Sequence, residues 1–218
     1  MFTPAQKDAL QEYMNIFTGH AASLLSQMVN KRIIFSISEL KLIHVNQQSA
    51  QERESNYRDQ RLPLMFQGHI VSSTIRFGRQ FSGKAHLVFP VEDSKYLVQL
   101  CLPEDTDSEL NIPGELTDTD YDAIREIGNV ILNSIAGGFG NLLEVPLEIE
   151  LPEVKVLASF NPMEEKEDLK SERYILIFFN SFSVQDSDVA GAVVVVLSID
   201  SITMLLKKID QVLLDCEE

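Results

Sequence analysis

Two long segments of the chain carry apolar residues at helical spacing. Apolar positions recur every three or four residues through residues 4–29 and again through residues 118–144. Thr3 precedes the first segment and is typical of an N-cap, while Pro4 and Gln6 occupy its first and third positions. We therefore predict two long amphipathic helices, each with one apolar face to bury.

After each of these helices, apolar and polar residues alternate in shorter segments. The alternation predicts strands at about 32–45, 63–78, 83–90, 146–158, 173–184 and 189–198. Residues 46–62 are polar without any period, which predicts a solvated loop. Shorter helices are expected near residues 92–102 and 200–214.

The two halves of this pattern correspond to each other. Three polar residues of the first helix recur 114 positions later in the second helix. The first motif is Asp8, Glu12 and Asn15, and the second motif is Asp122, Glu126 and Asn129. The same offset places the apolar positions of residues 33–42 on those of residues 147–156, and an offset of 108 places residues 83–91 on 191–199. Three matching segments in the same order indicate an internal duplication.

One repeat contains a helix, three strands and a helix. A three-stranded sheet with an uncovered face is marginal alone, whereas two repeats that share one sheet would bury that face. We expect an α+β fold with pseudo-two-fold symmetry, a six-stranded, mainly antiparallel sheet and long helices packed on it. Residues 1–218 would form a single domain of two repeats, at about 1–102 and 117–218, joined by the linker 103–116.

Composition excludes several classes of function. The net charge of −15 argues against a nucleic-acid or anionic-membrane surface, because both reward clustered Lys and Arg. No secretory signal pattern opens the chain, and the longest apolar run, residues 189–197, has the length of a buried strand. Cys101 and Cys216 are isolated, which fits a reducing compartment. We expect a cytoplasmic protein that binds neither nucleic acid nor membrane.

The two motifs are the candidate site. Their residues stand at i, i+4 and i+7, so they share one line on each helix, opposite the apolar residues. The carboxylates and carboxamides should therefore face outward, available to a partner. A solvated helix face that was copied by duplication would give the same pattern. Free variation beside the motifs, as in Gln11 against Arg125 and Tyr13 against Ile127, favours a functional reason for the match.

With these residues the sequence resembles the CheC, CheX and FliY phosphatases of bacterial chemotaxis. Their signature is Asp or Ser, three residues, Glu, two residues, Asn, twenty-two residues and Pro. The second motif completes this signature with Pro152, whereas the first motif has Ser38 at that place. The resemblance covers essentially the whole chain, and two full Glu-x2-Asn pairs favour CheC over CheX, which looks like a one-site relative.

The resemblance implies hydrolysis of the aspartyl phosphate on a CheY-like response regulator. Asn15 and Asn129 would position the attacking water, because a carboxamide both donates and accepts hydrogen bonds. Glu12 and Glu126 would anchor the active-site lysine of the receiver. The supporting motif residues are Asp8, Asp122 and Pro152. The missing proline at Ser38 puts the geometry of the first site, rather than its chemistry, in question.

The same resemblance sets the expected partners. The receiver would carry the Mg²⁺, so no cofactor or metal is expected on this chain. The four histidines also lack the paired spacing of metal ligands. A CheD-like regulator is a further possible partner. The alternative function is that of a non-catalytic adaptor that binds receivers or flagellar-switch proteins, although such switch proteins are expected to lack the Glu-x2-Asn pairs.

Overall fold

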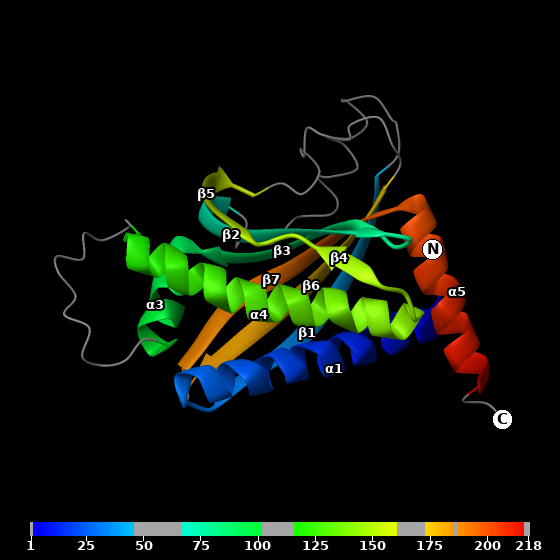
Figure 1. Cartoon of the computed structure of the whole chain (residues 1–218), viewed down its shortest axis with the longest axis horizontal. Helices are drawn as coiled ribbons and strands as arrows, with labels where there is room; N and C mark the ends of the chain where they lie inside the picture. The colour runs from blue at the N-terminus through cyan, green and yellow to red at the C-terminus, as the bar shows by residue number, and fades with distance from the viewer. Residues whose placement is uncertain (1, 46–66, 102–115, 161–172, 185–186, 216–218) are drawn as a thin grey trace.

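The computed structural model describes residues 2–45, 67–101, 116–160, 173–184 and 187–215, which form one sheet with long helices on it (Figure 1). The helices are α1 (Pro4–Val29), α3 (Val91–Cys101), α4 (Asp118–Leu143) and α5 (Ile199–Asp215). The strands are β1 (Ile33–Val45), β2 (Gln67–Arg79), β3 (Gly83–Pro90), β4 (Leu147–Ile149), β5 (Glu153–Ser159), β6 (Arg173–Val184) and β7 (Ser187–Ser198). None of the described helices is long and apolar enough to cross a membrane.

The sheet joins strands from both halves of the chain. Its order is β1-β6-β7-β3-β2-β4, with β5 also paired to β2, and every one of these pairs is antiparallel. The hairpins β2–β3 and β6–β7 meet through β3 and β7. The strand after each long helix pairs with the hairpin of the other half, β1 with β6 and β4–β5 with β2. The predicted α+β fold with a mainly antiparallel sheet is thus confirmed.

Local signals explain where the long helices begin. The Thr3 side chain accepts a hydrogen bond from the Gln6 backbone, and the Gln6 side chain accepts one from the Thr3 backbone, so the predicted capping box is present. Thr117 and Asp120 form the same box at the start of α4. These reciprocal bonds satisfy backbone N–H groups that a helix start leaves without partners.

The strand predicted at 146–158 is interrupted, which corrects the expectation of one continuous strand. Pro152 stands in the gap between β4 and β5 and is buried. A proline has no backbone N–H to donate to a ladder, so pairing stops there. The equivalent position in β1 is Ser38, where the pairing with β6 shifts register and the Ser38 hydroxyl donates to the Phe179 carbonyl at 3.2 Å. Both halves therefore break their ladder at the same place by different means.

The main core lies between α1, α4 and the sheet. Leu10, Met14, Ile131 and Phe139 are fully enclosed there. A second apolar cluster occupies the opposite face of β6 and β7, so these strands are buried on both sides, as the apolar run at 189–197 predicts.

Two residues on the predicted apolar face of α1 are not enclosed. Leu24 is 37% exposed and Met28 is 50% exposed. Leu24 lies at the edge of the apolar arc and Met28 lies in the last turn of the helix. The predicted loop 46–62 and nearly all of the linker 103–116 lie outside the described residues, and the division into two repeats stays a prediction.

Candidate functional site

The long helices that carry the motifs lie side by side on one face of the sheet and run in opposite directions (Figure 1). Phe17 of α1 packs directly against Gly138 of α4. A β-carbon at Gly138 would lie 2.4 Å from the Phe17 ring, so a larger residue would push the helices apart. Phe17 also packs edge-on against Phe139, with ring centroids 5.7 Å apart. Gly138 thus allows the two helices to pack closely.

Both motifs face outward, as predicted. Asp8 and Glu12 are exposed and Asn15 is half-buried on α1. Asp122 and Glu126 are likewise exposed on α4, and Asn129 is half-buried. Each carboxamide therefore rests partly on its helix while each glutamate is free to reach another molecule.

The surroundings of the two motifs differ. In the second motif Asp122 forms an ion pair with Arg125, and Asn129 Oδ1 accepts a hydrogen bond of 2.8 Å from Asn133 Nδ2. The positions in α1 that correspond to Arg125 and Asn133 are Gln11 and Gly19, which cannot supply the same cation or amide. The copied residues are thus held differently in the two halves.

The structure does not bring the two motifs together. Phe17 and Gly138 are in contact and therefore lie at the same height along the two helix axes. Asn15 stands two residues before Phe17, and Asn129 stands nine residues before Gly138. Because the helices are antiparallel and rise about 1.5 Å per residue, the two carboxamides are separated by about 16 Å along the helix axes. Two separate sites follow, rather than one composite site.

Gly128, between the second-motif glutamate and asparagine, sets the height of α4 above the sheet. A β-carbon there would lie 2.2 Å from Ser73 Oγ of β2 and 2.7 Å from Ser73 Cβ. The corresponding residue of α1 is the fully buried Met14. Sequence reasoning missed this contact, and the glycine inside a helical pattern was the available signal.

A groove opens beside the motifs where α1, α4 and α5 meet. Its volume is about 690 Å³, and it is lined by Ile16 and His20 of α1, Asn133 and Gly137 of α4, and Lys208 of α5. Ile16 is 56% exposed. Gly137 borders open space in this groove, since its β-carbon position meets nothing within 4 Å.

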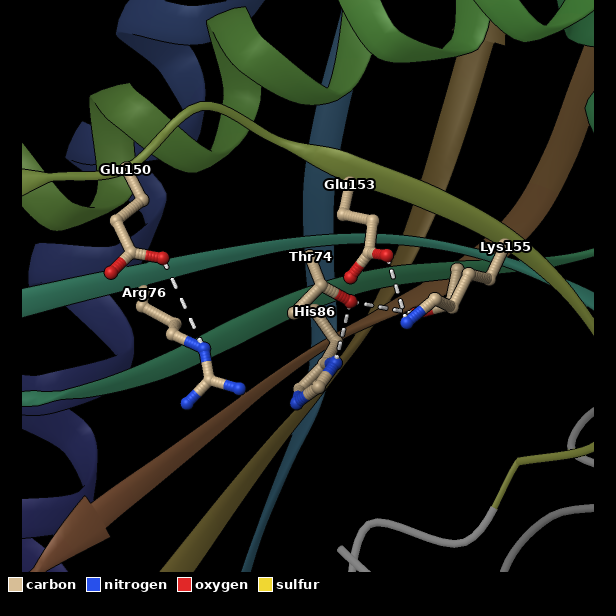
Figure 2. Close-up of polar contacts among 7 residues, drawn as sticks. Thr74, Arg76, His86, Glu150, Glu153 and Lys155 are labelled. Atoms are coloured by element: carbon tan, nitrogen blue, oxygen red, sulfur yellow. Dashed lines mark hydrogen bonds and ion pairs between the residues drawn. The ribbon is translucent and has the colours of Figure 1, made fainter. Parts of the chain in front are cut away.

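A cluster of polar side chains outside the motifs lies on the sheet face away from α1 and α4 (Figure 2). It consists of Thr74, Arg76, His86, Glu150, Glu153 and Lys155. It lines a smaller cavity of about 290 Å³ between β2, β3 and β5. Arg76 lies 3.9 Å from Glu150, and Lys155 lies 2.9 Å from Glu153. These opposite charges compensate one another, and the group contains no motif residue.

Outside the motifs, neither the Cys101 thiol nor a cluster of metal ligands offers a reactive site among the described residues. Burial raises the pKa of the Cys101 thiol to about 11, which keeps it protonated at neutral pH. Within the described ranges, no three residues among His, Cys, Asp and Glu gather as a metal site would require. The motif surface presents four exposed carboxylates and two half-buried carboxamides.

Known proteins share part of this sequence and the fold of this chain. Residues 6–36, which include the first motif, match the CheC-like family. The fold is similar to that of FliY from Thermotoga maritima, with a TM-score of 0.67 and 19% identity over 97% of this chain and 98% of that one. It is also similar to the FliM middle domain from H. pylori, with a TM-score of 0.60 and 11% identity over 95% and 99% of the two chains.

A third solved structure shows FliM from H. pylori in a complex with FliG, with a TM-score of 0.60 and 10% identity over 94% of this chain and 100% of that one. At such identities the likeness establishes the fold. The family match covers residues 6–36, and membership of the whole chain in the CheC/CheX/FliY family stays a prediction. A closer relation to CheC than to the other members stays a prediction.

Proposed function

We propose that this chain is a chemotaxis phosphatase that hydrolyses the aspartyl phosphate of a CheY-like response regulator in the cytoplasm. The observation that carries the proposal is the repeated placement of an exposed glutamate and a half-buried asparagine, three residues apart, on the outer face of α1 and of α4. The free variation beside the motifs, as in Gln11 against Arg125, favours a functional reason for this match over a solvated face copied by duplication.

The residue types suit a reaction in which the phosphatase positions a water molecule and supplies no nucleophile of its own. An aspartyl phosphate is an activated species, and the receiver would supply the Mg²⁺ that neutralises the phosphoryl oxygens. The phosphatase then has to hold a water molecule in line with the phosphorus. A carboxamide can accept from such a water and donate to it. Asn15 and Asn129 are the groups proposed for this role, and partial burial limits the freedom that they lose on binding.

The glutamates are proposed to dock the receiver. Glu12 and Glu126 project from the helices one turn before the asparagines. A carboxylate there can pair with a receiver lysine and fix how deep the asparagine enters. The net charge of −15 also favours a partner that presents a basic contact. Asp8, Asp122 and Pro152 are proposed to support the motifs without touching the phosphate.

A second candidate function is a non-catalytic adaptor for receivers or flagellar-switch proteins. The similarity to the FliM structures, one of them a complex with FliG, supports this candidate. Two intact Glu-x2-Asn pairs favour the phosphatase, because an adaptor has no need of them. Regulation by a CheD-like protein belongs to the same set of proposals.

The deciding experiment measures the decay of a phosphorylated CheY-like receiver in Mg²⁺, with and without this protein. We expect acceleration by the wild type and none by the double variant Asn15→Ala/Asn129→Ala. Gln27→Ala, an exposed change on α1 outside the motif, is the matched control and should keep full activity. Binding of the receiver without faster decay of its phosphate would refute the phosphatase proposal and support the adaptor.

A further inference from the structure

Asn133 distinguishes the second motif from the first. It stands one turn beyond Asn129 on the same line of α4, and its Nδ2 donates to Asn129 Oδ1 at 2.8 Å. The corresponding residue of α1 is Gly19, which has no side chain. Asn15 therefore cannot have the equivalent amide neighbour.

The Asn133 carboxamide is itself constrained. Its Oδ1 is buried and has no hydrogen-bond partner among the described residues. A buried polar atom without a partner is costly, so its presence in a fold needs an explanation. Here the amino group of the same carboxamide is directed at Asn129.

We propose that Asn133 is a positioning residue for Asn129 and makes the second site the more active of the two. This inference rests on the proposed phosphatase function. With Oδ1 held by Asn133, the Asn129 carboxamide has a fixed plane, and its Nδ2 is left to face the receiver. The rotation that Asn15 loses only when the receiver binds is already lost at Asn129, which lowers the barrier at the second site.

Loss of Asn133 should slow the chemical step rather than weaken binding. In an Asn15→Ala background, where the second site alone works, we expect Asn133→Ala to lower kcat about fivefold to tenfold and to leave KM within about twofold. Asn141→Ala, an exposed change two turns further along α4, is the matched control and should alter neither constant. An unchanged kcat in the Asn133 variant overturns the proposal.

The reverse change should improve the first site. A β-carbon at Gly19 meets nothing within 4 Å, so α1 can accept a side chain there. In an Asn129→Ala background, Gly19→Asn should raise the kcat of the first site about threefold or more. Gly19→Ala raises the helix propensity at least as much without adding an amide, and it should leave kcat unchanged. Equal effects of the two changes would contradict a positioning role.

A measurement that needs no activity separates this inference from the proposed function. The side-chain amide of Asn129 can be followed by ¹⁵N relaxation in the wild type and in Asn133→Ala. We expect its order parameter to fall in the variant. No change would refute the positioning whether or not the protein is a phosphatase. If the order parameter falls but the protein does not accelerate dephosphorylation of the receiver, the phosphatase proposal is refuted and the positioning of Asn129 by Asn133 stands.

Discussion

Phe17 of α1 packs in the space that a side chain at position 138 of α4 would occupy, with the ring 2.4 Å from the site of the absent β-carbon. This contact fixes how closely the two motif helices approach. It also sets their relative level, and therefore the separation of the two candidate sites. The groove between α1, α4 and α5 opens next to it, where Gly137 leaves room.

Gly138→Ala should destabilise the fold. The added methyl group meets the root of an aromatic ring in the core, and such overpacking costs about 1–3 kcal/mol. The better helix propensity of alanine returns about 1 kcal/mol. We expect a net loss of up to about 2 kcal/mol in the free energy of unfolding, measured by urea titration. Gly137→Ala, whose methyl group meets nothing, should be neutral or stabilising, and equal effects would contradict the packing account.

The two sites should work independently, because they lie about 16 Å apart along the helix axes. Asn15→Ala and Asn129→Ala should each retain part of the receiver phosphatase activity, with the larger share lost in Asn129→Ala. Both positions are on the outer helix faces, so both variants should keep the wild-type melting temperature within a few degrees. Complete inactivity of either single variant would mean that the two motifs act as one site.

Local signals made much of the fold predictable. Thr3, Pro4 and Gln6 define the start of α1 through contacts within four residues, so the predicted helix 4–29 coincides with the structure. The break at Pro152 was also visible in the residue itself, but the alternation of apolar residues on both sides predicted a single strand. Alternation reports which face a residue occupies and does not report where a ladder stops.

Long-range relationships were not available from the pattern. Nothing in residues 33–45 indicates that β1 pairs with β6 of the other half, because strand order depends on contacts far apart in sequence. The outward direction of the motifs followed from the helical wheel. The hydrogen bond between Asn129 and Asn133 did not, since spacing brings the two side chains near each other without orienting their amides.

Ser38→Pro should be tolerated and should complete the first motif. Ser38 falls at the register shift between β1 and β6, outside the paired positions, so no aligned ladder position is lost. The cost is the hydroxyl bond to the Phe179 carbonyl, about 1 kcal/mol. Ser38→Ala removes this bond alone and is the matched control. Thermal melting should show similar stability for both variants, and unfolding of the proline variant alone would show that β1 needs the backbone N–H.

Gly128→Ala should impair the second site, because Gly128 is buried against β2 between the two motif residues. Its methyl group would lie 2.2 Å from Ser73 Oγ, so α4 must move away from β2 between Glu126 and Asn129. We expect a loss of about 1–3 kcal/mol in the free energy of unfolding. In an Asn15→Ala background we also expect receiver dephosphorylation to fall about tenfold or more, because small displacements of a positioned group are costly. In an Asn129→Ala background, where only the first site remains, the same change should have a much smaller effect on activity. Equal losses in the two backgrounds would show that Gly128 supports the fold as a whole rather than the placement of the second motif.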